Sequence, residues 1–498
     1  MSSIHWPHGK SGRRSLARAI STFSSRNMHG RGEAVMTDYD LRVAGGSLVT
    51  PSGVVQQDLL VAGGVVAAIV DPGAQASAAE VVNAKGLHVF PGVVDPHVHL
   101  GPNITYPQNP EDALPESRSG AAGGVTSLLA YLMTAEPYHD VFPVAKQTMG
   151  THSQVDFGFH FCVVTRDQLD QIPSYARDLG VSSYKFFMNF RGEEGAYLGL
   201  PGNDDGFMFD LLEACADIGT MLDPHAENIE LVWRLREKGI PEGRTALEEW
   251  NLIRPDYVEA DALNRLAFLS RVTGASVYAV HTTSALALDV LQQGRMDYEN
   301  IFVESCPHYL TLDVDSACGV YGKVNPPLRY ASDRDAMWSA LEEGSIDTIG
   351  SDHVPRHKSF KEKDIWTASA GFPGMENLLP SLISEGFHKR GLSLPRIAQV
   401  TSERPAQLFG MYPQKGALLP GSDADFVLVD LDATHMVVGG EQQSGAEYSP
   451  WEDWEMKGSV RSTFLRGTRI FDVVEGFSDP GGQFLSRRYS GARALEEV

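Results

Sequence analysis

Two histidines, one residue apart, follow an apolar run in PGVVDPHVHLGPN, residues 91–103. Side chains of a β-strand point to the same face at every second position, so His97 and His99 would share one face. Imidazoles placed in this way suit a divalent metal ion, although a lone histidine near a strand end is more often a hydrogen-bonded structural residue. Asp95 would support such a site structurally. The motif alone leaves both interpretations open.

Four other strand-like runs end in, or contain, a residue that can bind a metal ion. These are Lys185 in VSSYKFFM, His225 in GTMLDPHAEN, His281 in ASVYAVHTTS and Asp352 in SIDTIGSDHVP. In a barrel of parallel strands, side chains at the carboxyl ends of the strands converge on one face. Each residue by itself has an ordinary structural explanation, but their shared position at strand ends favours a common metal site.

Lys185 is an unusual member of this set, because an ammonium group repels a metal ion. Burial and nearby cations would lower its pKa and favour the neutral amine. A neutral amine can take up carbon dioxide and become an anionic carbamate, which could bridge two metal ions. We therefore expect a carbamylated Lys185 and two divalent metal ions.

The elements that must position these residues are of two kinds. Residues 36–90 and 413–476 contain short β-type runs separated by turn residues, whereas residues 91–412 alternate strands with helices. This order predicts an α/β protein with a (β/α)8 TIM-like barrel and a small β-sandwich domain built from both ends of the chain. Residues 1–35 would form a disordered or targeting-like extension, and residues 477–498 a C-terminal tail.

Composition excludes several classes of function. The formal net charge is -23, with 64 acidic against 41 basic residues, which argues against nucleic-acid binding. No apolar run approaches the ~18 residues that a membrane-spanning helix needs. The four cysteines are too few and too scattered for a disulfide framework or a cysteine zinc site. These features predict a cytoplasmic protein with a small soluble substrate.

The motifs, in their order, resemble those of cyclic amidohydrolases of the dihydropyrimidinase and hydantoinase group, within the metal-dependent amidohydrolase superfamily. The resemblance covers about residues 36–488 and rests on PGVVDPHVHL, AAGGVTSLL, YKFFM, HAEN, VYAVHTTS, ESCPHYLTL, NPPLR, GSDHVP, GFPGMEN, KGALLPGSDADFVLVD and YSPWE. It implies one metal ion on His97, His99, carbamylated Lys185 and Asp352, and a second on Lys185, His225 and His281. All six positions carry the required residue. Zinc is the expected metal, with manganese, cobalt or nickel as alternatives.

The resemblance also implies a reaction. A hydroxide shared by the two metal ions would attack the carbonyl of a cyclic amide or imide, such as a hydantoin or dihydropyrimidine. Asp352 would accept the proton of the nucleophile and deliver it to the leaving nitrogen. Because this group generally assembles, the protein would be a homodimer or homotetramer.

The residues expected to contact the substrate depart from the pattern of the group. Phe190 stands where the group has an oxyanion-stabilising tyrosine, and Asn325 replaces a serine that binds the ring amide. Ala370 takes the place of a ring-binding asparagine, and His353 would orient the substrate, support Asp352 or be structural. Without the phenol, the oxyanion would depend on the metal ions, backbone amides or Asn325.

Other functions remain as alternatives. NPPLR and SDHVPRHK resemble dihydroorotases, but Gly101 stands where those enzymes have a carboxylate-binding arginine. An allantoinase-like enzyme, or a hydrolase of a linear amide or ester, would use the same metal ligands. A non-catalytic scaffold related to dihydropyrimidinase is disfavoured, because such a protein has no chemical reason to retain the complete ligand set.

Overall fold

The computed structural model describes residues 38–192 and 194–487. The extension predicted for residues 1–35 and the end of the predicted tail lie outside the described residues. Among the helices that are described, none combines the length and the apolar character needed to cross a membrane.

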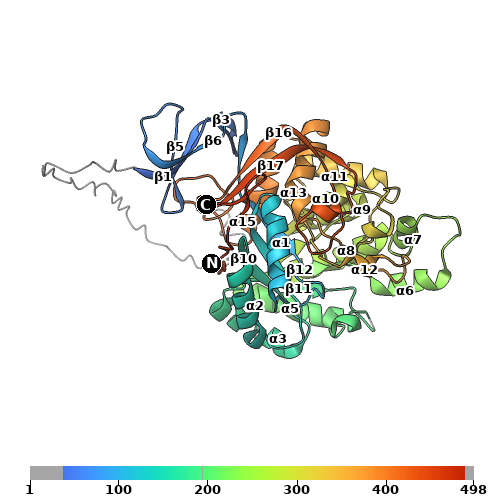
Figure 1. Cartoon of the computed structure of the whole chain (residues 1–498). Coiled ribbons are helices and arrows are strands. Elements are labelled where there is room, and N and C mark those ends of the chain that lie inside the picture. Colours follow the sequence, from blue (N-terminus) through green and yellow to red (C-terminus); the bar gives the residue numbers. More distant parts are fainter. Residues whose placement is uncertain (1–37, 193, 488–498) are drawn as a thin grey trace, which may run out of the picture. The chain divides into compact units, whose positions relative to one another are not determined.

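Eight parallel strands form the barrel sheet, in sequence order around the sheet (Figure 1). They are β8 (Val93–Val98), β9 (Val125–Leu132), β10 (Asp156–Cys162), β11 (Ser183–Phe187), β12 (Met221–His225), β13 (Ser276–Ala279), β14 (Ile301–Ser305) and β15 (Thr348–Ile349). A bridge between Val98 and His353 connects the first strand to the segment after the last, and the His99 N–H donates to the His353 carbonyl at 2.8 Å. Every residue of β9 is buried, because helices cover one face of the sheet and side chains fill the other.

Helices follow most of these strands. The longer ones are α1 (Pro110–Ala122), α2 (Tyr138–His152), α5 (Asp205–Ile218), α6 (Ile229–Lys238), α7 (Ala246–Ile253), α8 (Asp256–Thr273), α9 (Ala285–Asp297) and α11 (Ala331–Glu343). Shorter ones are α3 (Arg166–Asp170), α4 (Ile172–Ser174), α10 (Pro307–Thr311), α12 (Lys358–Lys361), α13 (Leu378–Ser381), α14 (Leu394–Ala398) and α15 (Arg404–Leu408). Local chemistry sets their ends: Asp204 accepts the Phe207 N–H at 3.0 Å before α5, and Gly274 ends α8 with a φ of 76°.

Two further sheets lie outside the barrel: residues 39–83 alone form one, and strands from both ends of the chain form the other. One has the order β5-β4-β1-β6, formed by β1 (Tyr39–Ala44), β4 (Asp58–Ala62), β5 (Val65–Val70) and β6 (Ala78–Asn83). The other has the order β19-β18-β17-β16-β7-β2-β3, formed by β2 (Ser47–Thr50), β3 (Gly53–Gln56), β7 (His88–Pro91), β16 (Phe426–Met436), β17 (Glu455–Leu465), β18 (Thr468–Asp472) and β19 (Gly476–Phe477). Strand β7 pairs antiparallel with β16, so Val89 lies opposite Leu428. The predicted fold class is confirmed, while the domain boundaries stay a prediction.

The described part of the C-terminal tail lies on the barrel of its own chain. Phe484 forms a parallel bridge with Phe157 of β10, and the Leu485 N–H donates to the Phe157 carbonyl at 2.7 Å. Beyond it, Arg487 is buried and donates to the Phe159 carbonyl. These contacts show that residues 483–487 extend the packing around β10.

A buried ionic cluster joins the barrel to the strands from the chain ends. The ammonium of Lys415 lies 2.5 Å from a carboxylate oxygen of Asp156 and 2.8 Å from oxygens of both Asp423 and Asp425. Arg466, which follows β17, also pairs with Asp156. Because Asp156 begins β10 and Asp425 precedes β16, the cluster ties the two sheets together.

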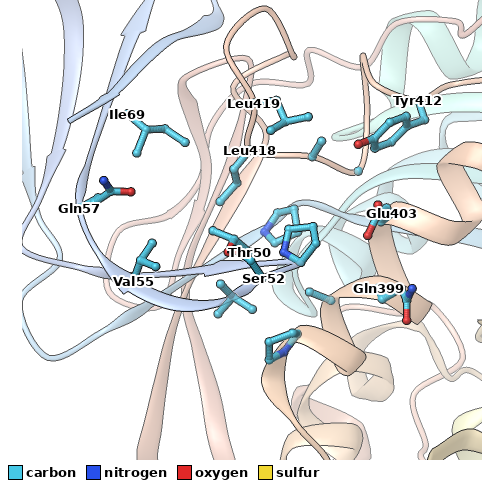
Figure 2. Close-up of a pocket in the computed structure, with 17 residues that line it drawn as sticks. Thr50, Ser52, Val55, Gln57, Ile69, Gln399, Glu403, Tyr412, Leu418 and Leu419 are labelled. Carbon is cyan, nitrogen blue, oxygen red and sulfur yellow. Dashed lines mark hydrogen bonds between the residues drawn. The ribbon is translucent and has the colours of Figure 1, made fainter. Parts of the chain in front are cut away.

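A largely apolar cavity of about 300 Å³ lies between β2 and β3 on one side and helix α14 and residues 412–419 on the other (Figure 2). Pro91, which precedes β8, lines it, so the cavity is near the amino end of that strand. Its lining includes one carboxylate, Glu403, and no imidazole. This cavity is therefore separate from the predicted metal site, which lies at the carboxyl ends of the barrel strands.

Candidate active site

The six predicted ligand positions line one pocket of about 80 Å³ at the carboxyl ends of the barrel strands. They are His97, His99, Lys185, His225, His281 and Asp352. His97 lies in β8, Lys185 in β11, and His225 is the last residue of β12. His281 and Asp352 lie in the connections that follow β13 and β15. Parallel strand ends thus bring residues from distant parts of the sequence to one place.

The carboxylate of Asp352 lies next to the rings of His97 and His99. Its Oδ1 atom is 3.1 Å from Nε2 of His97 and 3.6 Å from Nε2 of His99. The ring of His281 has its centroid 5.4 Å from that of His97, and the rings of His225 and His281 are 4.6 Å apart. The four imidazoles therefore form a continuous cluster around the carboxylate.

Several nitrogen atoms in this cluster have no hydrogen-bonding partner. The buried Nδ1 atoms of His99 and His281 lack one. His97 uses Nδ1 to contact Glu304 at 2.7 Å, which leaves Nε2 directed at Asp352. Buried polar atoms are almost always satisfied, so the unsatisfied ring nitrogens of this cluster are available to bind a further group. Imidazole nitrogen and carboxylate oxygen fit a divalent metal ion.

Two buried glutamates orient the histidines. Oε1 of Glu304, on β14, accepts from His97 Nδ1 and from the His281 N–H, the latter at 2.9 Å. Glu227 accepts from Nε2 of His225 at 2.7 Å and from Arg254 at 2.8 Å. Carboxylates that bind the second ring nitrogen of a metal-binding histidine fix its tautomer and orientation. Neither glutamate was predicted as part of the site, although Glu304 lies in the motif ESCPHYLTL and Glu227 in the motif HAEN.

Lys185 is enclosed, with 1% of its surface exposed. Its Nζ atom lies 4.6 Å from the ring centroid of Tyr131 and 5.3 Å from that of Phe187. Burial lowers the pKa of Lys185, and the carboxylates of Asp352 and Glu304 oppose this effect only in part. The environment thus favours the neutral amine that carbamate formation requires.

Asp352 has the opposite electrostatic setting. Burial raises the pKa of its carboxyl group, but the nearby imidazoles, above all His97, outweigh burial and hold the pKa well below its usual range. Asp352 and His281 also have positive φ angles, of 46° and 39°. Such backbone conformations are uncommon outside glycine and persist where the surrounding structure imposes them. Both residues are therefore held in place by the fold.

Of the four residues expected to contact the substrate, three line the pocket and one does not. Phe190, Asn325 and Ala370 line the pocket. Phe190 stacks on Phe187 with a centroid distance of 4.2 Å, and the Asn325 Oδ1 atom accepts from Trp250 Nε1 at 2.9 Å. His353 is buried, does not line the pocket, and has its Nε2 atom 2.8 Å from Glu116.

The geometry thus favours the structural alternative for His353. Asp95 is also structural, as expected: its Oδ1 atom accepts from the backbone N–H groups of His97, at 3.2 Å, and Ser351, at 3.0 Å. These bonds hold the end of β8 against the segment that carries Asp352. Neither residue needs a direct contact with a substrate to matter for the site.

Comparisons with known proteins place this arrangement in a family. The sequence model described as "Amidohydrolase family" matches residues 88–470. The chain is 32% identical to an L-hydantoinase of Paenarthrobacter aurescens over 90% of its length and 98% of the relative. It is 29% identical to a D-hydantoinase of Geobacillus stearothermophilus, with 91% of this chain and 98% of the relative covered.

Solved structures agree with the sequence relatives. The crystal structure of a dihydropyrimidinase from Brevibacillus agri superimposes with a TM-score of 0.82 at 29% identity, covering 90% of this chain and 98% of that one. An L-hydantoinase structure from Arthrobacter aurescens gives a TM-score of 0.83 at 32% identity, covering 90% of this chain and 100% of that one. The chain therefore belongs to the amidohydrolase family, within its hydantoinase and dihydropyrimidinase group.

Proposed function

We propose that this protein opens a cyclic amide or imide ring of the hydantoin or dihydropyrimidine type by metal-dependent hydrolysis. The observation that carries the proposal is the convergence of four imidazoles, one carboxylate and one buried lysine on a single pocket. Relatives named hydantoinase and dihydropyrimidinase support the same reaction class. A scaffold role is disfavoured, because it would leave these buried groups without a purpose.

Two divalent metal ions fit the donor set. His97, His99, Asp352 and Lys185 would hold one, while Lys185, as a carbamate, would share the second with His225 and His281. Zinc is the expected ion, with manganese, cobalt and nickel as alternatives for the same ligands. When bound, such ions lower the pKa of water and polarise a carbonyl group.

Asp352 is the proposed proton carrier. Its carboxylate is ionised at neutral pH, because the surrounding imidazoles hold its pKa low. It would accept the proton of the attacking water and return it to the leaving ring nitrogen. Asp352 lines the pocket, and its contacts with the histidines hold the carboxylate there.

Asn325 is the proposed donor to the carbonyl oxygen that becomes negatively charged. An indole N–H can only donate, so the Trp250 contact engages the amide oxygen of Asn325 and leaves its NH2 group for the pocket. Phe190 cannot donate a hydrogen bond, and its stacking with Phe187 instead makes an apolar wall. Phe190 and Ala370 would therefore contact the ring or its substituent without polar bonds.

A dihydroorotase-like function is less well supported. At Gly101, where the resemblance would require an arginine, a Cβ atom would lie 2.6 Å from a carboxylate oxygen of Asp112. The backbone there also has a φ of 72°, which side chains rarely adopt. Homo-oligomeric assembly and a cytoplasmic location stay predictions.

The first experiment is turnover of hydantoin, 5-substituted hydantoins, dihydrouracil, dihydroorotate and allantoin, with metal content measured on the same sample. Opening of a hydantoin or dihydrouracil at two metal ions per chain is the expected result. Turnover of dihydroorotate or allantoin alone would move the substrate assignment to those classes. Full metal content without any turnover would contradict the proposed substrate class, and absence of bound metal would favour the scaffold.

Asn325→Ala tests the oxyanion donor. We expect kcat to fall about 100-fold, as for loss of other single oxyanion donors, at unchanged metal content. Trp250→Phe removes the indole N–H together with part of the ring but keeps Asn325, so it should give a smaller loss than Asn325→Ala. Unchanged kcat in Asn325→Ala would assign oxyanion stabilisation to other groups.

A further inference from the structure

Two irregular segments form part of the pocket wall. Val324 and Asn325 lie in the connection after the short helical turn Gly319–Gly322, and Ala370 and Gly371 lie in the segment before Phe372. None of these four residues belongs to a helix or strand. Connections of this kind need other contacts to keep a fixed position. The contacts around Lys361 supply them.

The side chain of Lys361, at the end of α12, is fully buried. Its ammonium donates to the backbone carbonyls of Lys323 at 2.9 Å, Ser369 at 3.0 Å and Gly371 at 2.9 Å. These carbonyls adjoin the pocket residues of both segments. The backbone N–H of Gly371 donates to the same Lys323 carbonyl at 2.9 Å. One side chain thus connects both parts of the wall.

Burying the Lys361 ammonium costs free energy of folding, so stability by itself does not explain a lysine at this position. A buried ammonium loses its hydration, and all three of its protons must find acceptors to offset that loss. Burial, and after it the neighbouring Lys323, lower the pKa of Lys361. Among the described residues no carboxylate forms an ion pair with Lys361, so the three carbonyls are its main acceptors. An apolar side chain would avoid the desolvation of the ammonium but would take its donor away from the carbonyls of Lys323, Ser369 and Gly371. The lysine is better explained by the geometry that it imposes.

Lys323 extends the same network. Its ammonium donates to the carbonyl of Ala368 at 2.6 Å and reaches that of Trp366 at 3.4 Å. It also lies 3.9 Å from the ring centroid of Trp250, the residue that orients Asn325. Residues 366–371 are thus bound by two buried lysines from different parts of the chain.

We propose that Lys361 is a positioning residue that holds residues 323–325 and 369–371 at a fixed separation and thereby sets substrate affinity and selectivity for the ring substituent. The proposal rests on the proposed function of the pocket. Lys361 acts through the backbone of both segments, with no direct role in proton transfer. Its effect belongs to the part of the wall formed by Asn325 and Ala370, because none of the six ligand positions lies in these two segments.

Lys361→Met removes the donors while keeping a side chain of similar length, and Lys358→Met, on the exposed side of the same short helix, is the matched control. In Lys361→Met we expect KM to rise roughly tenfold or more at unchanged metal content, and kcat to fall by less than the about 100-fold expected for Asn325→Ala, because Asn325 is displaced but still present. The ratio of kcat/KM between unsubstituted and bulky 5-substituted hydantoins should fall. Lys358→Met should match the wild type.

Hydrogen exchange gives a readout independent of activity. Amides in residues 321–325 and 366–372 should exchange faster in Lys361→Met, while those in β11 and β12 keep their protection. If Lys361→Met does not fold, Lys323→Met, which loses contacts with the Ala368 and Trp366 carbonyls, should show the same pattern to a smaller degree. If the wild type opens none of the rings, the proposed function fails, whereas the exchange experiment still tests the positioning role.

Two results would overturn the proposal. One is a folded Lys361→Met protein with wild-type KM and wild-type exchange in both segments. The other is a loss of kcat and metal content together at unchanged KM, which would place the effect of Lys361 at the metal centre. Faster exchange confined to residues 321–325 and 366–372, with the rise in KM, would support it.

Discussion

Two buried clusters in this protein bring three possible metal ligands within 4.8 Å of one another: His97, His99 and Asp352, and Asp156, Asp423 and Asp425. They differ in where the nearest lysine lies. Lys415 contacts all three aspartates, and Arg466 pairs with Asp156. Lys185 instead lies over the ring of Tyr131. The acidic cluster therefore already contains its cation, whereas the histidine cluster does not.

The pKa values of Lys415 and Lys185 accordingly shift in opposite directions. Burial lowers the pKa of both, but around Lys415 the carboxylates, led by Asp425, outweigh it and raise the pKa above the ordinary value. Around Lys185 burial prevails and the pKa falls. Proximity of acidic groups is thus insufficient to indicate a metal site, because a built-in ammonium can provide the compensating charge. Variants of these two lysines test the contrast directly.

The largest effect is expected for Lys185→Ala. Loss of the residue proposed to bridge both metal ions should lower kcat/KM by about a thousandfold or more, since metal catalysis contributes several kcal/mol. Metal content should fall at one or both sites, as measured by elemental analysis of the purified protein. Full activity with two bound ions in this variant would contradict the ligand assignment.

Lys415→Met should change stability rather than chemistry. Removing one partner from a buried ionic cluster costs about 3–5 kcal/mol, because the aspartates lose their main counter-charge. Denaturant unfolding measures this loss, and metal content should remain that of the wild type. A variant that keeps its stability, or loses a metal ion, would show that the acidic cluster has another role.

Glu304→Gln probes the carboxylate that orients His97 and His281. We expect metal affinity to fall about 10- to 100-fold, because outer hydrogen-bonding partners of metal ligands have effects of this size. Competition with a chelator measures the affinity. Glu299→Gln, an exposed position shortly before the same strand, should leave it unchanged. Equal affinity in both variants would assign Glu304 a purely packing role.

The smallest expected effect concerns how the contribution of Lys415 to the free energy of unfolding depends on pH. Because the folded-state pKa of Lys415 is raised, its stabilising contribution is complete below the unfolded-state value of about 10.4 and is lost as pH rises through the folded-state value. The stability difference between wild type and Lys415→Met should therefore stay constant from about pH 7 to 9. Unfolding titrations at several pH values measure it, and a decline within this interval would mean that Lys415 loses its proton near neutrality.

Much of the site was predictable from sequence because of strand order. Apolar runs that end in histidine, lysine or aspartate, alternating with helical segments, indicate parallel strands whose carboxyl ends converge. This reasoning placed His97, His225 and Asp352 together without any structural information. Phe190 and Asn325 were identified through the family resemblance alone, and both line the pocket.

Other features depended on contacts between residues far apart in the chain. His97 meets Glu304 across 207 positions, and His353 meets Glu116 across 237, so no local pattern reveals either pair. Nor does any motif show that Lys361 joins two pocket segments, or that Lys415 occupies the acidic cluster. Sequence by itself determined the order of strands and the residues at their ends, because these follow from local periodicity, and its motifs carried the resemblance to the family. Tertiary structure alone decided which charged groups meet, because the direction and burial of each side chain are set by long-range packing.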